Sequence, residues 1–382
     1  MIDLRNGDCL EVLKNIEDNS VDLILTDPPY ELNFMNKGWD NTGIAFNIEV
    51  WKEAYRVLKP GGYCMAFSGS RTYHRMAVAI EDAGFEIKDM IEYIYGSGFP
   101  KALSIDKALD KLLGATPEII GRNPNSRENC DKSNTLYESG TVGKTAYITK
   151  PSSDIAKQYE GYKTQLKPAH EPICLAMKPL SEKNFAENVM KWGTSGLNID
   201  GTRVAYKNEK DAKEGRSERK TTSKGQFATL TKDDKFVRSD RSYLEGRYPA
   251  NFIISEDIAH VLDKQSKEAS RFFYNAKIEE EDYTPFCYAA KASKKERNSD
   301  IEGQIHNGLN NHATVKPKSI LTYLLKLGLP PQDSVVLDMF AGSGSLGLAI
   351  ADINKETGRN HKAILIEKDE EHCEIIKKRC CL

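Results

Sequence analysis

An apolar run that stops at two prolines constrains the fold of this chain more than any other feature. Residues 21–26 (VDLILT) have the composition of a buried parallel strand, and the tetrapeptide Asp27-Pro28-Pro29-Tyr30 must end it. The elements expected next alternate in type: a helix over 49–58, a strand over 63–67, a helix over 73–83 and a strand over 85–94. This alternation predicts βαβ units and therefore an α/β fold.

The same rhythm returns near the other end of the chain. The elements expected there are a helix over 318–329, a strand over 334–337, a helix over 345–353, a strand over 363–366 and a helix over 370–379. Residues 121–167 and 206–247 are polar, and we interpret them as insertions, loops or a separate small module. One sheet completed by strands from both ends fits this arrangement.

The composition is that of an ordinary globular protein, with 39% hydrophobic and 29% charged residues, and no apolar stretch is long enough to span a membrane. The opening residues lack the basic and apolar regions of a signal peptide, so we expect a cytoplasmic location. The eight cysteines form no C-x-x-C pair, and no metal site is predicted. Because the net charge is -2, any attraction to nucleic acid must be local.

The tetrapeptide Asp27-Pro28-Pro29-Tyr30 follows a strand at the edge where open α/β sheets bind ligands. Asp27 and the Pro28 carbonyl are suited to accept the two hydrogens of an aromatic amine, which exposes the nitrogen lone pair to an electrophile. Pro28 and Pro29 hold this backbone rigidly. Tyr30 offers a face on which an extruded base can stack. The alternative interpretation is a turn without chemistry.

A second motif, Asp338 to Ser345, lies between an expected strand and an expected helix. Its glycines permit close approach of a ligand, and Glu367 at the end of the next strand is placed to accept hydrogen bonds from ribose hydroxyls. These features predict a nucleoside cofactor site. Gly342, Gly344 and Gly347 also fit a dinucleotide-binding pattern, but an acid-Pro-Pro-aromatic tetrapeptide has no role in hydride transfer. The two motifs together favour methylation of an amine.

The motifs and their order resemble the DNA amino-methyltransferases of the beta class, in which the catalytic motif precedes the cofactor motif. Further segments carry the resemblance: 6–9, 58–62, 96–101, 167–172, 246–251, 289–293 and 312–317. Departures are Ala313, where the family usually has proline, and Ser345, where it often has threonine. The resemblance implies a circularly permuted, Rossmann-like S-adenosylmethionine-dependent methyltransferase sheet with an inserted target-recognition region.

The resemblance also implies roles for individual residues. Asp8 would meet the adenine of S-adenosylmethionine, and Thr314, Lys316 and Pro317 would approach its methionine end. The remaining cofactor-binding residues would be Asp338, Phe340, Ala341, Gly342, Ser343, Gly344, Ser345 and Glu367. We divide the chain into a catalytic half (1–120), a polar insertion that returns to the core (121–177), a target-recognition region (178–251) and a cofactor-binding half (252–382).

The expected activity is transfer of a methyl group from S-adenosylmethionine to N6 of adenine in double-stranded DNA, after base flipping and by direct in-line attack. Methylation of cytosine N4 is the nearest alternative, and the aspartate at position 27 favours adenine. Methylation of a protein glutamine or an RNA base would place the motifs in the opposite order. Carbon-5 methylation of cytosine needs a cysteine nucleophile, typically in a Pro-Cys pair, which is absent. A catalytically silent DNA-binding protein is a more distant alternative.

Residues 207–241 carry eleven Lys or Arg against seven Asp or Glu. This excess favours an arm that contacts DNA phosphates, with a solvated loop of mixed charge as the alternative. A cognate restriction endonuclease is a further candidate partner, and the chain is expected to act as a monomer or a homodimer without a membrane.

Overall fold

The structure is a computed structural model that describes residues 1–32, 41–96, 102–122, 147–215, 246–266, 268–276, 297–306, 310 and 315–382. The chain forms two compact units. The larger unit comprises Met1–Tyr30, Gly43–Ser97 and His170–Leu382, and the smaller unit comprises Glu31–Thr42 and Gly98–Ala169.

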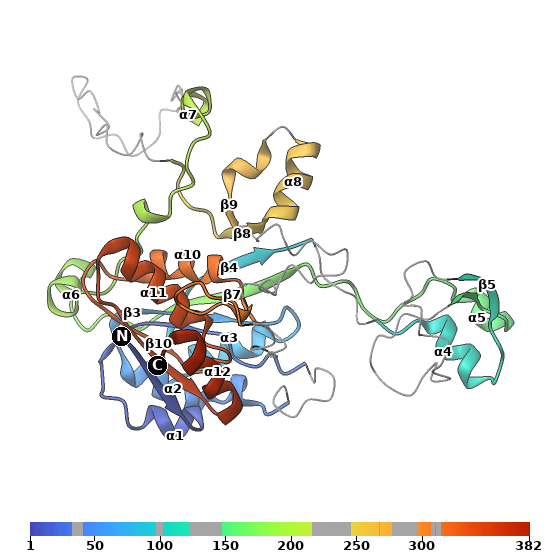
Figure 1. The fold of residues 1–382 in the computed structure, drawn as a ribbon, viewed down its shortest axis with the longest axis horizontal. Coiled ribbons are helices and arrows are strands. Elements are labelled where there is room, and N and C mark those ends of the chain that lie inside the picture. Colours follow the sequence, from blue (N-terminus) through green and yellow to red (C-terminus); the bar gives the residue numbers. More distant parts are fainter. Residues whose placement is uncertain are drawn as a thin grey trace. The chain divides into compact units, whose positions relative to one another are not determined.

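A single large sheet organises the larger unit (Figure 1). Its described strands follow the order β1-β11-β10-β2-β3-β7-β4-β8-β9. All described neighbours are parallel except β7, which runs antiparallel between β3 and β4. The strands are β1 (Ile2–Asn6), β2 (Val21–Thr26), β3 (Leu58–Phe67), β4 (Glu86–Ile94), β7 (His170–Met177), β8 (Phe252–Ser255), β9 (Tyr274–Ala276), β10 (Val335–Asp338) and β11 (Lys362–Glu367).

Helices cover both faces of this sheet. The helices packed into its two cores are α1 (Cys9–Leu13), α2 (Ile48–Val57), α3 (Tyr73–Asp82), α10 (Lys318–Gly328), α11 (Ser345–Thr357) and α12 (Glu370–Cys380). The larger unit also contains α6 (Phe185–Trp192), α7 (Glu209–Gly215) and α8 (Glu256–Gln265), with short 3₁₀ turns at Ile44–Phe46, Asp200–Thr202 and Ala269–Phe272. Side-chain caps begin several of them. Asn47 accepts a hydrogen bond from the amide of Glu49 in α2, and Asp369 accepts one from Glu371 in α12.

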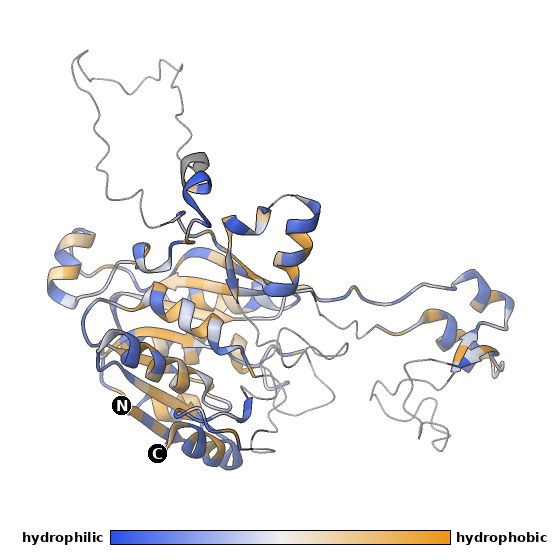
Figure 2. Cartoon of the chain, turned by 45° about the horizontal axis from the view of Figure 1, so that its top comes forward, coloured by the Kyte–Doolittle hydropathy of each residue, from blue (hydrophilic) through white to orange (hydrophobic). Residues whose placement is uncertain are grey.

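Strand side chains alternate between two hydrophobic cores, as the pleat of a sheet requires. In β2, Leu23 and Leu25 face the core formed with α10 and α11, whereas Ile24 faces the core formed with α1, α2 and α3. The near-continuous apolar strands are visible as orange ribbon in Figure 2. Every residue of β2 is buried, and a sheet covered on both faces explains why Leu23, Ile24 and Leu25 are apolar in succession rather than alternating with polar residues.

The sequence order of the strands is permuted. β1 pairs in parallel with β11, so the first strand completes the edge of the sheet beside the last one (Figure 1). β10 and β2 are neighbours, and the connections from these two strands lead in opposite directions across the sheet, to β11 and to β3. This is the topological switch point of a doubly wound fold. The expected α/β, Rossmann-like, permuted architecture is confirmed.

β3 differs from its predicted extent. The sequence predicts that Pro60-Gly61-Gly62 separates a helix from a strand, but β3 already begins at Leu58. The strand continues through an irregular stretch in which Gly61 donates a 2.9 Å hydrogen bond to the Lys178 carbonyl, and Lys178 donates one of 3.0 Å to the Gly62 carbonyl. Gly61 has φ 73°, and a Cβ there would lie 2.0 Å from Oγ of Ser195. The glycine is therefore required by close packing within a strand.

The smaller unit contains α4 (Ile105–Leu112), the antiparallel pair β5 (Glu118–Arg122) and β6 (Tyr147–Lys150), and α5 (Asp154–Gln158). Asp110 holds it together. Its carboxylate accepts hydrogen bonds from the amides of Ser152 and Ser153, at 2.9 and 3.0 Å, and from the Ser153 hydroxyl at 2.6 Å. These bonds fix the entry to α5 against α4.

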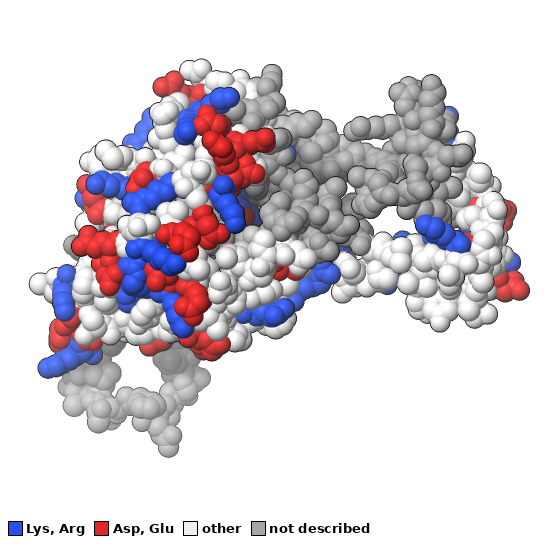
Figure 3. Space-filling view, turned by 90° about the horizontal axis from the view of Figure 1, so that it is seen from below, with Lys and Arg blue, Asp and Glu red and all other residues white. Residues whose placement is uncertain are grey.

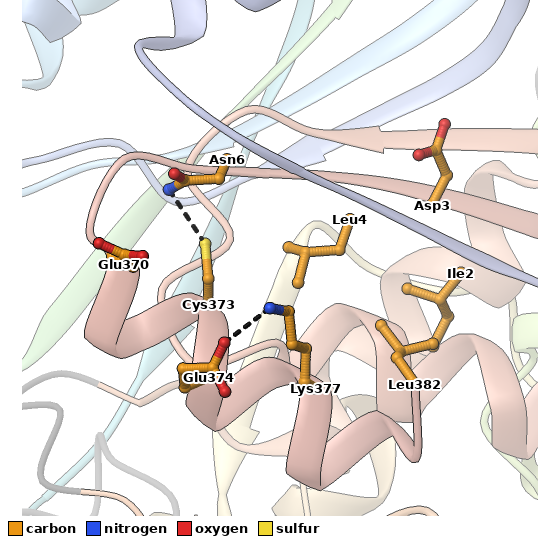
Figure 4. A pocket seen from close by; sticks show the side chains of 9 residues that line it. All are labelled: Ile2, Asp3, Leu4, Asn6, Glu370, Cys373, Glu374, Lys377 and Leu382. Atoms are coloured by element: carbon orange, nitrogen blue, oxygen red, sulfur yellow. Dashed lines mark hydrogen bonds and ion pairs between the residues drawn. The ribbon is translucent and has the colours of Figure 1, made fainter.

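A recess of about 510 Å³ opens beside β1 and α12 (Figure 4). Asn6, Cys373, Glu374 and Lys377 are among its lining residues, and none of the predicted site residues lines it. The motifs therefore lie elsewhere. Among the described residues, no helix has the length and apolar composition needed to cross a membrane.

Candidate active site

The two sequence motifs meet at the carboxyl ends of the neighbouring strands β2 and β10. Thr26, the last residue of β2, donates a 2.8 Å hydrogen bond from its hydroxyl to Oδ1 of Asp338, the last residue of β10. The amide of Met339 donates to the Thr26 hydroxyl at 3.2 Å. The fold thus brings the catalytic and cofactor motifs together at the switch point, where open α/β sheets bind ligands.

Asp27 and Tyr30 of the first motif both contact Lys316. The Lys316 ammonium lies 2.6 Å from Oδ2 of Asp27 and 2.9 Å from the Tyr30 hydroxyl. The Tyr30 hydroxyl in turn donates a 3.1 Å hydrogen bond to Glu171, which lies at the start of β7 and 3.5 Å from the same ammonium. Two carboxylates, one ammonium and one phenol therefore form a single cluster, called here the Lys316 cluster.

Burial changes the proton affinities of this cluster. It raises the pKa of the Glu171 carboxyl and, together with the charge of Asp27, raises the pKa of Tyr30 well above its usual value. Burial alone would lower the pKa of Lys316, but Asp27 and Glu171 outweigh it, and the pKa is raised. Lys316 is therefore charged and Tyr30 is a neutral hydrogen-bond donor at neutral pH.

One carboxylate oxygen of Asp27 has no hydrogen-bond donor among the described residues. Its Oδ1 is buried, and no described residue donates a hydrogen bond to it. A buried acceptor without a donor is costly, so such an atom in a native protein calls for an explanation. Pro28, beside it, is buried, and the Tyr30 carbonyl accepts a 2.8 Å hydrogen bond from the Thr72 hydroxyl. The backbone of the motif is thus fixed, while Oδ1 of Asp27 accepts no hydrogen bond from a described residue.

The glycine loop is fastened to Glu367. The Gly342 amide donates a 2.7 Å hydrogen bond to Oε2 of Glu367, and the Asp369 amide donates to Oε1 at 2.8 Å. Gly342 and Gly344 have φ of 55° and 79°, in the region that favours glycine. Gly344 precedes α11, so the amino-terminal end of a long helix opens at the loop.

Arg379 of α12 binds the glycine loop from the protein interior. Its side chain is only 1% exposed, and Nη1 donates hydrogen bonds to the carbonyl of Ser343 at 2.7 Å, to the Ser343 hydroxyl at 2.9 Å and to the Ser345 hydroxyl at 3.4 Å. The Ser343 and Ser345 side chains therefore point to the protein interior. Their role in the structure is to bind Arg379.

Burial raises the pKa of Asp338 to about 7, with the charges of Asp27 and Glu367 acting in the same direction. Asp338 also accepts a hydrogen bond from the Phe340 amide at 3.1 Å, which shapes the start of the loop. Phe340 is half-buried, and Ala341 is buried and donates its amide to the Ile366 carbonyl at 2.9 Å.

The other predicted cofactor residues occupy separate positions. Asp8 caps α1 by accepting a 3.1 Å hydrogen bond from Leu10, and Lys368 lies 3.1 Å from its other oxygen. Asp8 follows β1, whose Asn6 is in register with Glu367, so both acids lie at one edge of the sheet. Pro317 immediately precedes α10. Thr314 lies outside the described residues.

Several residues of the site carried no role in the sequence interpretation. Thr26 was treated only as a strand end, and Glu171 only as part of a shared segment. Arg379 was detectable, because its spacing from Cys373 and Ile376 places it on the buried face of α12. Lys316 was assigned to the cofactor, and no local pattern indicated its contact with Asp27. Within the described ranges, no group of three or more His, Cys, Asp and Glu residues is arranged to hold a metal ion.

The hydrogen-bond acceptors at this edge of the sheet fit a nucleoside cofactor. Two carboxylates, Glu367 and Asp8, lie at one sheet edge, where they can accept hydrogen bonds from ribose hydroxyls and from an adenine amine. The left-handed Gly342 turn donates its amide to Glu367, so the backbone of the loop lies beside this carboxylate. The fold and this site define a Rossmann-like protein of the methyltransferase class.

Comparison with known proteins identifies the family. The N6/N4 family model, described as DNA methylase, matches residues 21–378, so the chain belongs to this DNA methylase family. The predicted resemblance to DNA amino-methyltransferases is confirmed. S-adenosylmethionine, the methyl donor of these enzymes, is confirmed as the cofactor.

Individual relatives match over shorter stretches. The chain is 34% identical over 113 residues to the type II methyltransferase M.HpaI of Haemophilus parainfluenzae, over 28% of this chain and 36% of the relative. It is 27% identical over 135 residues to M.HindIII of Haemophilus influenzae, over 24% and 43%. The matches thus span less than half the length of these curated relatives.

Solved structures of DNA methyltransferases align along nearly the whole chain at low similarity. The PvuII DNA methyltransferase, described as cytosine-N4-specific, has 14% identity and a TM-score of 0.47, covering 99% of this chain and 86% of that one. The complex of M1.HpyAVI with S-adenosylmethionine has 16% identity and a TM-score of 0.39, covering 99% of each chain. The family assignment rests on the family model and not on these alignments.

Proposed function

We propose that the protein methylates N6 of adenine in double-stranded DNA, using S-adenosylmethionine as the methyl donor. The observation that carries this proposal is the buried Oδ1 of Asp27, which lacks a donor among the described residues and lies beside the rigid Pro28-Pro29 backbone. An exocyclic amino group supplies the missing donor. The aspartate at position 27 favours adenine over cytosine N4, the nearest alternative.

In this mechanism the target base leaves the helix and stacks on Tyr30. Asp27 and the Pro28 carbonyl accept the two hydrogens of its amino group and hold the nitrogen lone pair toward the methyl donor. S-adenosylmethionine supplies a methyl group made electrophilic by the positive charge on its sulfur. Transfer of this methyl group would leave S-adenosylhomocysteine, and the methylated nitrogen would lose one proton to water. Pro29 keeps the backbone of the motif in place.

The proposed cofactor contacts are Glu367 with the ribose hydroxyls, Asp8 with the adenine, and Lys316, Pro317 and Thr314 with the methionine end. The loop from Asp338 through Phe340 to Ser345 would form the floor of the site. Arg379 supports this assignment indirectly, because it holds the loop through Ser343 and Ser345. We retain the division into catalytic half (1–120), polar insertion (121–177), recognition region (178–251) and cofactor-binding half (252–382).

Target recognition is assigned to residues 178–251, with DNA phosphate contacts within 207–241. Val204 and Arg247 exchange backbone hydrogen bonds of 3.0 and 2.8 Å, so the intervening segment leaves and re-enters the fold at one point. Asp211, which is buried, pairs with Arg247 and, at 3.0 Å, with Arg271. The hydrogen bond from Arg247 lowers the pKa of Asp211 to about 2. This ion cluster fixes the root of the proposed recognition segment.

On the face drawn in Figure 3, the Lys and Arg residues are interspersed with Asp and Glu. A surface of mixed sign gives little general attraction for a phosphate backbone. Duplex DNA is the proposed substrate. A cognate restriction endonuclease, the monomeric or dimeric state and a cytoplasmic location stay predictions.

The test is to compare the parent with Asp27→Ala. DNA from cells that express each protein is digested and analysed for N6-methyladenine and N4-methylcytosine, and sequenced by a method that detects modified bases. We expect N6-methyladenine with the parent and none with Asp27→Ala, whose S-adenosylmethionine affinity by calorimetry stays within a few-fold. N4-methylcytosine would establish the alternative base, and full activity of Asp27→Ala would overturn the catalytic assignment.

A further inference from the structure

Glu171 is a carboxylate at the candidate site that the proposed mechanism does not use. It is the second residue of β7, which lies between β3 and β4 in the sheet, and its side chain is 15% exposed. Its Oε2 accepts the hydrogen bond of the Tyr30 hydroxyl at 3.1 Å and lies 3.5 Å from the Lys316 ammonium. It therefore contacts Tyr30 of the base-binding motif directly and is linked to Asp27 through Lys316.

A second buried carboxylate is not needed to neutralise Lys316. The 2.6 Å contact with Asp27 already pairs the ammonium with one opposite charge. Adding Glu171 costs further desolvation, which is offset only where geometry and hydrogen bonds are good. Both partners of Glu171 supply such contacts, and both also contact the motif. A second carboxylate kept in a largely enclosed site at this cost is typical of a functional arrangement.

The geometry gives Asp27 two unlike oxygens. Lys316 binds Oδ2 from one side, and this leaves Oδ1 as the acceptor for which no described residue is a donor. The ammonium also lies 4.9 Å from the centre of the Tyr30 ring and 5.0 Å from that of Phe67, so aromatic faces confine it. Its position thus determines which way the carboxylate faces.

We infer that Lys316 and Glu171 are the positioning residues of the amine-binding site: Lys316 holds one oxygen of Asp27, and Glu171 holds Lys316 and the Tyr30 hydroxyl. Together they keep the acceptor oxygen and the stacking ring in one fixed relation. This inference rests on the proposed function, because it assigns to the pair the task of orienting Asp27 toward an amine.

The experiment is a double-mutant cycle of Glu171→Gln and Lys316→Met, with single-turnover methylation measured at saturating cofactor and DNA. Glutamine keeps the size of the side chain and removes its charge. We expect Glu171→Gln to slow the single-turnover rate roughly 10- to 100-fold, the range that misplacement of a reacting group produces. Its S-adenosylmethionine affinity should stay within threefold. In the Lys316→Met background, Glu171→Gln should add little, because the two residues act as one unit.

A matched control is available in the same strand as the motif. Asp22 of β2 is buried and pairs with Lys59 at 2.6 Å, at the opposite end of the strand from Asp27. Asp22→Asn should lower the melting temperature and leave the single-turnover rate unchanged. A purely structural role for Glu171 would give that same pattern in Glu171→Gln and would overturn the inference.

The outcomes separate this inference from the proposed function. If Asp27→Ala is inactive while Glu171→Gln methylates at the parent rate, the positioning role is wrong and the proposed function stands. If Asp27→Ala is itself active, the proposed function fails, whatever Glu171→Gln does. A rate loss in Glu171→Gln that disappears at higher cofactor concentration would assign Glu171 to cofactor binding and also overturn the inference.

Discussion

Thr26 donates its hydroxyl hydrogen to Asp338 across 2.8 Å, although 312 residues separate the two in sequence. This bond lies between β2 and β10, the neighbouring strands that carry the two motifs. Any displacement of one motif relative to the other must therefore strain or break it.

Thr26→Val should destabilise the protein. Valine has the shape of threonine but leaves the Met339 amide without its acceptor, and it removes one of the two hydrogen bonds that Oδ1 of Asp338 accepts from described residues, in a region that is almost fully buried. A buried polar group deprived of its partner costs about 1–3 kcal/mol. Urea unfolding of parent and variant at one pH measures the difference. A variant as stable as the parent would mean that the bond contributes nothing.

Asp338→Asn should change how stability depends on pH. The folded pKa of Asp338 is about 7 and the ordinary value is 3.8, so the folded protein holds this proton more tightly than the unfolded chain. Stability from this group is present at low pH and is lost as pH rises from about 4 to about 7. Each unit of the difference corresponds to roughly 1.4 kcal/mol.

Because asparagine keeps the acceptor oxygen and does not ionise, Asp338→Asn should gain stability relative to the parent as pH rises from about 4 to about 7. Above about pH 7 the difference should be constant. Denaturant unfolding of both proteins across this range tests the sign. A stability difference that does not vary with pH would show that Asp338 ionises normally.

Gly342→Val and Glu367→Ala should both weaken binding of S-adenosylmethionine. Valine is strained at φ 55° and obstructs the approach of a ligand to the loop. Loss of Glu367 removes the proposed acceptor of the ribose hydroxyls and the anchor of the Gly342 amide, each a charge-assisted bond worth about 1.5–3 kcal/mol. Calorimetric titration gives the affinities. Unchanged affinity in both variants would remove the cofactor from this loop.

Arg379→Met should weaken the attachment of the glycine loop to α12. The variant keeps an apolar filling side chain but removes three hydrogen bonds to Ser343 and Ser345. We expect weaker cofactor binding together with a lower melting temperature. Ser343→Ala removes one of these contacts and should have a smaller effect, and little further effect in the Arg379→Met background. Full additivity of the two substitutions would contradict a direct coupling.

Replacing residues 216–235 by a short Gly-Ser linker should abolish methylation at the normal target sequence and leave cofactor affinity intact. The deletion spares Asp211, which anchors the root of the segment through Arg247 and Arg271. Cofactor titration and duplex methylation are measured on the same protein. Methylation at the parent rate would place recognition elsewhere, with residues 121–167 as the next candidate.

Local patterns were sufficient for the elements around the motifs. Leu23, Ile24 and Leu25 are apolar in succession because their strand is buried on both faces, and the predicted helices at 318–329 and 370–379 match α10 and α12 closely. β7 was not predicted. It passes between β3 and β4 in the antiparallel direction, and its position depends on strands that are far away in the sequence.

The site was predicted in outline only, for the same reason. Asp27 and Glu367 could be named because each follows a recognisable strand. The contact between Lys316 and Asp27 joins residues 289 positions apart, and no sequence periodicity reports such a contact. Arg379 was overlooked because basic residues near the end of a helix usually face solvent, whereas this one is buried beneath the loop.

Because β1 pairs with β11, the pairing of β1 during synthesis must wait until the end of the chain has been translated. Ile2 is in register with Ala363, so β1 emerges about 360 residues before the strand on which it pairs. At a synthesis rate of about 5–20 residues per second, that wait lasts roughly 20 to 70 s. During this time the nascent chain exposes an unpaired strand edge that can associate with other chains. The permuted order therefore makes productive folding sensitive to the speed of translation and to chaperones that shield the waiting strand.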